Sequence, residues 1–288
     1  MNRALVVGLS AATLTFAGSG VASATGSGSL GPTSPAPAAP TGVTTTESSY
    51  PTNHGPEAMT VYRSSGATVR NAAAVVMVHG GAWIRGSRAL LDSEARQAAA
   101  AGFVVFDIDY DLAAPRYPRQ VQDVESAIDF IHNNARRFGI SPNRIGALGT
   151  SAGANLLMEA STSGHAPLKA VVGWSGPYDL TGRGGLKDIA LAGGSAAVYL
   201  GCIPVLPSCA KRAADASPAR HVVAGTPRAL LFNSANELIP LNQMTDFASA
   251  LRAVGTPVET HVVPGTGHAV AYAGQAIGPT LSFLERYL

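Results

Sequence analysis

The chain has 288 residues, enough for one full-size α/β domain that buries a large core. Its formal net charge is +2 and only 13% of its residues are charged. This balance excludes the basic surface of a nucleic-acid-binding protein and gives no reason to expect electrostatic binding to a membrane surface.

Residues 1–24 have the pattern of a secretory signal peptide. Arg3 supplies the positive charge, residues 4–16 form an apolar run, and Ala22-Ser-Ala24 is a small-residue cleavage site. An uncleaved membrane anchor is the other interpretation, but the apolar run is too short and too rich in Gly, Ser and Thr for stable membrane insertion. We therefore expect a soluble, secreted chain.

The segment that follows the cleavage site is rich in Gly, Ser, Pro, Ala and Thr. Such a composition cannot bury enough apolar surface to fold, so residues 25–49 are predicted to be a disordered linker. The folded catalytic domain is expected to span residues 50–288.

Strand and helix patterns alternate through this domain. The run at 58–62 alternates like an edge strand, whereas 74–78 is continuously apolar, as expected of a strand covered on both faces. Further strands are predicted at 103–108, 144–148, 170–174, 229–232 and 258–263, and helices at 90–101, 121–138, 154–161, 243–254 and the end of the chain. This order predicts an α/β fold with a mostly parallel sheet and helices on both faces.

The motif Gly149-Thr-Ser151-Ala-Gly153 lies between a predicted strand and a predicted helix. The two glycines remove side chains where the strand reverses into the helix, which leaves the Ser151 hydroxyl exposed above a helix N-terminus. An ordinary Gly/Ser-rich turn would share the composition. The strand–turn–helix context instead favours a nucleophilic serine.

The segment His79-Gly-Gly-Ala-Trp83 follows the strand that ends at residue 78. Consecutive glycines let backbone N–H groups point into a cavity, where they can stabilise a tetrahedral oxyanion. We expect the N–H groups of Gly81, Ala82 and Ala152 to be these donors, and His79 to hold the loop by a hydrogen bond. A plain strand-to-loop turn is the alternative.

One histidine of seven lies in a loop after the last predicted strand. His268 sits among the turn formers of Pro264-Gly-Thr-Gly-His268, which is the place for the general base. A loop histidine is commonly only solvated, but its position and its order after Ser151 favour catalysis.

Together these motifs resemble the α/β-hydrolase superfamily, in its esterase/lipase group related to hormone-sensitive lipase and the feruloyl-esterase-like branch. The resemblance covers residues 58–288 and rests on these segments: His79–Trp83, Asp109-Tyr110, Asp123, Gly149–Gly153, Ser217-Pro218 and Gly267-His268. It implies a secreted serine hydrolase that cleaves carboxylic esters through a Ser-His-acid triad. It implies no cofactor and no metal.

The third member of the triad departs from the family pattern. Relatives commonly carry T-A-D-E-x-V-P after the seventh strand, whereas this chain has Ser234-Ala-Asn-Glu-Leu-Ile-Pro240, so that Asn236 replaces the Asp. Asparagine can orient a histidine but cannot stabilise an imidazolium by charge. Glu237 is the predicted acid, and Asp179, just past an earlier strand, is one alternative. The other is that a different carboxylate serves, or that there is none and Asn236 orients the histidine.

The pattern of strands lapses between 174 and 221, and residues 176–220 are predicted to form a small lid. This region holds Cys202 and Cys209 across a Pro-rich loop. In an exported chain such a pair indicates a disulfide bond, and metal binding is the weaker interpretation because no other ligand lies nearby in sequence.

The expected substrate is a small-molecule or polymer-linked ester with a small or medium acyl group. Two other functions stay open at this stage. One is a peptidase or amidase on the same fold. The other is a non-catalytic binding module that retains the fold, which Asn236 keeps in consideration.

Overall fold

The computed structural model describes residues 42–65, 70–162, 166–183 and 194–288. The predicted signal peptide and residues 25–41 of the predicted linker lie outside the described residues. Within the described ranges, no helix is long and apolar enough to cross a membrane.

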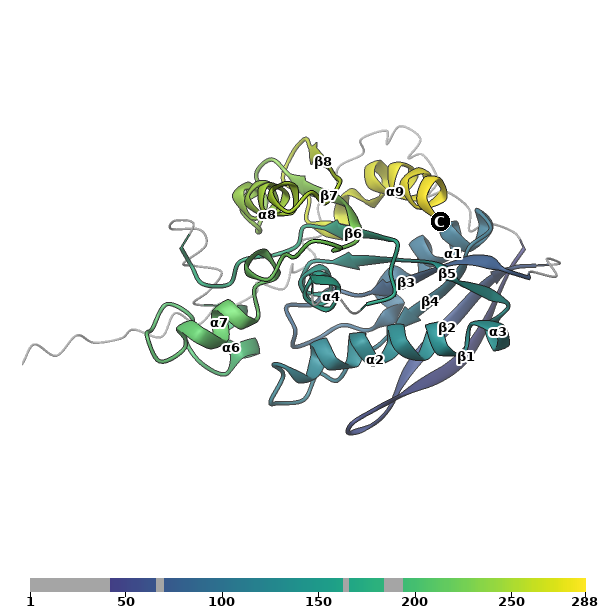
Figure 1. The fold of residues 1–288 in the computed structure, drawn as a ribbon, viewed down its shortest axis with the longest axis horizontal. Coiled ribbons are helices and arrows are strands. Elements are labelled where there is room, and N and C mark those ends of the chain that lie inside the picture. The colour runs from purple at the N-terminus through teal and green to yellow at the C-terminus, as the bar shows by residue number, and fades with distance from the viewer. Residues whose placement is uncertain (1–41, 66–69, 163–165, 184–193) are drawn as a thin grey trace, which may run out of the picture. The chain divides into compact units, whose positions relative to one another are not determined.

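The centre of the domain is an eight-stranded sheet with strand order β1-β2-β4-β3-β5-β6-β7-β8 (Figure 1). The strands β1 and β2 are antiparallel to their neighbours, and β4, β3, β5, β6, β7 and β8 run parallel to one another. The mostly parallel sheet predicted from the alternating elements is therefore confirmed. The strand bounds are β1 Val43–Thr52, β2 Gly55–Ser64, β3 Ala72–Val78, β4 Val104–Ile108, β5 Ile140–Thr150, β6 Ala170–Trp174, β7 Arg228–Ser234 and β8 Val258–Val263.

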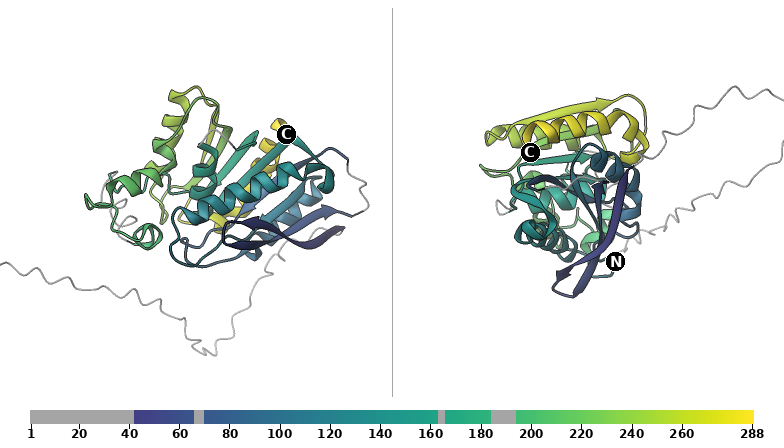
Figure 2. Two further views of the ribbon diagram at one scale, coloured as in Figure 1. Left: turned by 60° about the horizontal axis from the view of Figure 1, so that its bottom comes forward. Right: turned by 90° about the vertical axis from the view of Figure 1, so that its right-hand side faces the viewer.

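Helices cover both faces of this sheet because successive strand residues point to opposite sides. In β3, Val76 and Val78 pack into a cluster with α2, α4 and α8, whereas Val75 and Met77 pack into a second cluster with α1 and α9. Figure 2 shows α2 and α9 on opposite sides of the sheet. The α-helix bounds are α1 Asp92–Ala100, α2 Arg119–Asn133, α3 Ala135–Phe138, α4 Ala152–Thr162, α6 Ser195–Leu200, α7 Ala210–Asp215, α8 Leu241–Ala253 and α9 Ala273–Tyr287.

The prediction that a disordered linker reaches residue 49 is wrong, because β1 begins at Val43 and pairs along its length with β2. Most of β1 is exposed and polar, so it has no apolar pattern to recognise. Backbone pairing and its Thr residues, which favour extended structure, suffice for a strand at a sheet edge. The buried Tyr50 anchors it, donating a hydrogen bond of 2.5 Å to the Asp109 carbonyl.

The strand predicted at 58–62 is not at the edge of the sheet, because β1 occupies the edge. β2 lies between β1 and β4, so the run at 58–62 is an inner strand. The predicted helix at 121–138 divides at Asn134 into α2 and α3, and Gly139 ends it in the left-handed conformation, with φ 67°.

In the described part of the region predicted as a lid, the short helices α6 and α7 lie between β6 and β7. A disulfide bond joins Cys202 to Cys209 between these helices. Tyr199 of α6 stacks on Trp83, in the loop after β3, with ring centroids 4.7 Å apart. The segment thus packs against the carboxyl end of the sheet, which is where the predicted site lies.

Reduction of the Cys202–Cys209 bond is expected to loosen α6 and α7 before the sheet unfolds. The bridge spans only seven positions, so the chain-entropy model gives it about 2–3 kcal/mol of the free energy of unfolding. Hydrogen exchange measured with and without reductant should speed up first in residues 195–215. Equal acceleration in β3 and β5 would contradict a local role for the bond.

Candidate functional site

Ser151 occupies a sharp turn between β5 and α4, with a left-handed φ of 52°. Backbone approaches closely on both sides of this turn. A Cβ on Gly153 would lie 2.3 Å from the carbonyl oxygens of Val78 and His79, and one on Gly149 would lie 2.5 Å from the Gly153 carbonyl oxygen. Both positions therefore need glycine, and the serine is held rigidly at the carboxyl end of the sheet.

Three side chains that lie far apart in sequence form one hydrogen-bonded row. Ser151 Oγ is 2.8 Å from His268 Nε2. On the other side of the imidazole, His268 Nδ1 hydrogen-bonds Glu237 Oε2. The His268 side chain is 29% exposed and that of Glu237 is fully buried, so the row runs from the protein interior toward solvent.

The second oxygen of the Glu237 carboxylate is also bound. Glu237 Oε1 accepts hydrogen bonds from the Ser234 backbone N–H at 2.8 Å and from the Ser175 hydroxyl at 2.7 Å. Nearby, the Asn233 amide donates to the Ile239 carbonyl at 3.0 Å, which closes the loop after β7 around the glutamate. A buried carboxylate with donors on both oxygens is a satisfied acceptor in its charged form.

The two alternatives to Glu237, Asp179 and Asn236, do not contact His268. Asp179 accepts from the Thr181 N–H at 2.9 Å and forms an ion pair with Arg220 at 2.7 Å. Burial acts to raise the pKa of Asp179, but the hydrogen bonds from Thr181 and Arg220 outweigh it and hold the pKa below its ordinary value. Asn236 is exposed. Of these three residues, all within the described ranges, only Glu237 is in hydrogen-bond contact with His268.

The loop after β3 passes directly beside the serine. A Cβ on Gly80 would lie 3.0 Å from Ser151 Cβ, and Gly81, Ala82 and Trp83 have left-handed φ values of 128°, 56° and 61°. Positive φ values are uncommon for residues other than glycine, so the loop holds an unusual backbone conformation beside Ser151. The predicted donors Gly81 and Ala82 thus belong to a loop that lies against Ser151, and Ala152 follows Ser151 as the first residue of α4.

Buried polar side chains fix this loop. Trp83 Nε1 donates to Asn155 Oδ1 at 3.2 Å, and Gln120 Nε2 donates to the Trp83 carbonyl at 2.9 Å. His79 Nδ1 bonds the Gly80 carbonyl at 2.6 Å, and burial lowers the pKa of His79. The expected structural role of His79 therefore agrees with its contacts.

Two residues at the site were not predicted from the sequence. Ser175, directly after β6, hydrogen-bonds Glu237, and its Oγ lies 2.8 Å from the Tyr272 hydroxyl. The signal for Ser175 was its position at the carboxyl end of a buried strand. The same position after a strand also favours Asp179, four residues later, and only Asp179 offers the carboxylate that a triad acid requires.

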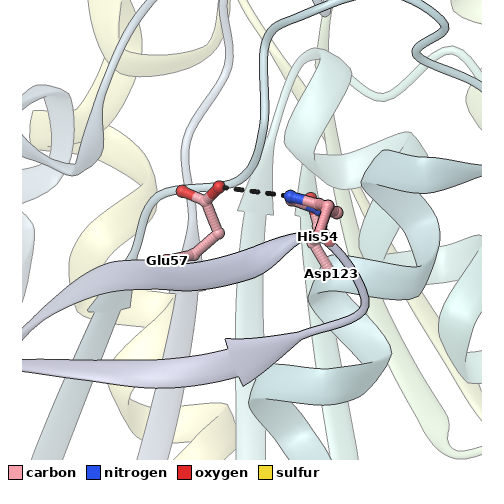
Figure 3. A group of neighbouring side chains, drawn as sticks. All are labelled: His54, Glu57 and Asp123. Atoms are coloured by element: carbon pink, nitrogen blue, oxygen red, sulfur yellow. Dashed lines mark hydrogen bonds and ion pairs between the residues drawn. The ribbon is translucent and has the colours of Figure 1, made fainter.

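Among the described residues, His54, Glu57 and Asp123 are the group whose ligand atoms lie close enough to hold a metal ion (Figure 3). They come from the β1–β2 turn, β2 and α2. His54 Nε2 is 2.7 Å from the buried Asp123, and His54 Nδ1 is 3.9 Å from Glu57 and 3.8 Å from Asp111. These contacts tie the β1–β2 hairpin to α2.

Comparison with known sequences supports the motif assignment. The BD-FAE family model matches residues 59–251, more than half of the chain. The chain is 30% identical over 249 residues to "Esterase LipC" of Mycobacterium tuberculosis (strain ATCC 25618 / H37Rv), which covers 79% of this chain and 60% of LipC. It is 30% identical over 213 residues to "Isoprenylcysteine alpha-carbonyl methylesterase ICME" of Arabidopsis thaliana, with 67% and 49% covered. The chain thus spans about half to three fifths of the length of these relatives.

Solved structures agree on the fold. A bacterial heroin esterase aligns with a TM-score of 0.74 at 21% identity, covering 85% of this chain and 84% of the other. The thermostable carboxylesterase EstE1, cloned from a metagenomic library, aligns with a TM-score of 0.73 at 23% identity, covering 84% and 88%. The fold is that of the α/β-hydrolases, and the chain belongs to the BD-FAE family.

Proposed function

We propose that this protein is a serine hydrolase that cleaves carboxylic esters through an acyl-enzyme intermediate. The observation that carries the proposal is the hydrogen-bonded row of Ser151, His268 and Glu237. The names of its relatives as esterases and its family membership support the same reaction class. No cofactor takes part in the proposed reaction.

In the first half of the reaction, Ser151 Oγ attacks the ester carbonyl carbon while His268 Nε2 accepts the hydroxyl proton. The tetrahedral intermediate then collapses: the bond to the alcohol oxygen breaks, and His268 returns the proton to that oxygen. In the second half, His268 takes a proton from water while the water oxygen attacks the acyl carbon on Ser151. The tetrahedral intermediate then collapses: the bond to Ser151 Oγ breaks, His268 returns the proton to Oγ, and the carboxylic acid leaves.

Glu237 acts through the histidine in both halves. Its carboxylate accepts a hydrogen bond from the Nδ1–H group, which leaves the Nε2 lone pair directed at Ser151 Oγ 2.8 Å away. Its negative charge also stabilises the imidazolium that forms at each proton transfer. Because the carboxylate is buried and fully hydrogen-bonded, this stabilisation is already in place before the substrate binds.

The oxyanion of each tetrahedral intermediate is assigned to the N–H groups of Gly81, Ala82 and Ala152. Ala152 opens an eleven-residue helix, so the positive end of the α4 dipole adds to the same site. The close packing of the loop after β3 against Ser151 supports this assignment.

Three exposed apolar side chains lie close in sequence to residues of the proposed site. Ile84, Leu238 and Val270 are 39%, 72% and 42% exposed. Each lies one or two residues from a residue of the proposed site. We assign them to the binding of the acyl or alcohol part of a small-molecule or polymer-linked ester.

A panel of p-nitrophenyl esters of increasing acyl length tests this proposal, with the matching p-nitroanilides as controls. We expect rapid turnover of esters, fastest for small or medium acyl groups, and slow turnover of anilides. Faster turnover of the anilides would indicate a peptidase or amidase. Failure of every substrate, together with failure to react with a fluorophosphonate, would indicate a non-catalytic module.

We also propose that the protein is exported and that its mature form begins at or near Thr25. The support is the charge, apolar run and cleavage site of residues 1–24. Intact mass measurement of protein recovered outside the producing cells should give a chain that starts near Thr25 with two fewer hydrogens from the disulfide. A full-length intracellular product would contradict export.

A further inference from the structure

Ser175 is a buried serine beside the proposed triad. It follows β6 directly, has no exposed surface, and has a left-handed φ of 53°. We propose that Ser175 is a positioning residue, whose one hydroxyl fixes both the triad acid and the turn that carries the histidine. The inference rests on the proposed function.

The directions of the hydrogen bonds at this hydroxyl follow from its partners. Ser175 Oγ lies 2.7 Å from Glu237 Oε1, 2.9 Å from the Ala269 backbone nitrogen and 2.8 Å from the Tyr272 hydroxyl. A carboxylate only accepts and a backbone N–H only donates, so Ser175 gives its single proton to Glu237 and accepts from Ala269. The Tyr272 hydroxyl has one proton, which it can give to Ser175 or to the Phe232 carbonyl oxygen 3.3 Å away. Ser175 donates to Glu237 and accepts from Ala269 in either case.

This arrangement connects the acid to the histidine by a second route. Glu237 bonds His268 through Oε2, while Ser175 bonds Glu237 through Oε1 and also bonds the residue after His268. Ser175 therefore holds the Glu237 carboxylate and the backbone that follows His268 at one fixed separation, on which the Glu237–His268 hydrogen bond depends. Ala269 itself has a left-handed φ of 49°, a strained conformation that its hydrogen bond to Ser175 helps to hold.

The hydrogen bonds of Ser175 matter more for a glutamate than they would for an aspartate. Glutamate has one more rotatable bond than aspartate, so its carboxylate is located less well by the backbone. Two donors fix Glu237 Oε1: the Ser234 backbone N–H and the Ser175 hydroxyl. Glu237 lies one residue after the position at which relatives carry the acid. Ser175 supplies the side-chain contact that orients its carboxylate toward His268.

The test compares Ser175→Ala with Ser175→Gly. Both lack the hydroxyl, but glycine adopts the left-handed φ freely, so an effect shared by the two variants is due to the hydroxyl and not to the backbone. Thr280→Val is the matched structural control. It removes a buried hydrogen bond of 3.1 Å to Trp174, the neighbour of Ser175, without touching the triad.

We expect both Ser175 variants to lower kcat for a p-nitrophenyl ester on the order of 10²-fold, with KM unchanged, because a small misplacement of catalytic groups has effects of that size. The downfield proton NMR resonance of the His268 Nδ1–H should broaden or disappear in both. Thr280→Val should lower the thermal unfolding midpoint but retain kcat and the resonance. Each kcat is calculated per folded molecule, using the fraction of protein that is folded at the assay temperature.

Retention of kcat and of the resonance in both Ser175 variants would overturn the inference. So would losses of kcat no larger than that of Thr280→Val, since these would show a purely structural role. A parallel Ser151→Ala sample distinguishes failure of the proposed function from failure of the positioning role of Ser175. Turnover that persists without Ser151 refutes the proposed function. An inactive Ser151→Ala beside unaffected Ser175 variants refutes the positioning role alone.

Discussion

The Ser151→Ala variant is expected to lose ester turnover by about 10⁶-fold in kcat, as loss of a triad nucleophile does in other serine hydrolases. The substitution removes the attacking oxygen and leaves His268 with no proton to accept. Alanine keeps the Cβ in the turn at φ 52°, and the lost contact is one hydrogen bond of 2.8 Å at the partly exposed end of the row. The midpoint of thermal unfolding should therefore change little.

Ser161→Ala is the control for this variant. Ser161 lies in α4, the helix that follows Ser151, and its hydroxyl donates to the Leu157 carbonyl at 2.6 Å, away from the triad. It should retain the native kcat. Appreciable turnover by Ser151→Ala, measured in protein free of the native enzyme, would show that another group performs the attack.

Glu237→Gln is expected to lower kcat on the order of 10⁴-fold with a small change in the free energy of unfolding. Glutamine has nearly the same shape, and its amide oxygen can still accept from Ser234 and Ser175. Its amide N–H₂ would then face His268 Nδ1, which favours the tautomer with the proton on Nε2. That tautomer cannot take the proton of Ser151, and the charge that stabilises the imidazolium is gone.

Two further variants make this prediction specific. Asp179→Asn should have a mild effect on kcat because Asp179 is paired with Arg220. Adding Asn236→Asp to Glu237→Gln should restore part of the lost activity, since it returns a carboxylate to the family position. If Asp179→Asn lowered kcat as much as Glu237→Gln, the acid would have been assigned to the wrong strand end.

The parts of the site that the sequence predicts well are those determined by local backbone geometry. Gly149, Ser151 and Gly153 form a short motif because the turn excludes side chains at the two glycine positions, and this exclusion is visible in the sequence itself. His268 was located because the order of strands determines which loops meet at one edge of a parallel sheet. The main alternation of strands and helices is predicted from continuous apolar runs in the buried strands and helical spacing of apolar residues between them.

The parts that were missed depend on contacts between distant segments. β1 is exposed and polar, so only its pairing with β2 makes it a strand. Ser175 lies 62 positions before Glu237, and a single serine after a strand has no pattern that distinguishes a hydrogen-bond donor from a turn residue. The choice between Glu237 and Asp179 likewise depends on contacts between distant segments. Glu237 bonds His268, whereas Asp179 pairs with Arg220.

The most direct test of the central claim is to locate the covalent adduct that a fluorophosphonate forms with the native protein. Digestion and tandem mass spectrometry should find one adduct per chain, on Ser151, and prior labelling should abolish ester turnover in proportion to its extent. His268→Ala should slow the labelling strongly because the serine would have no base. An adduct on a different residue, or full ester turnover by a protein whose Ser151 is fully labelled, would contradict the account.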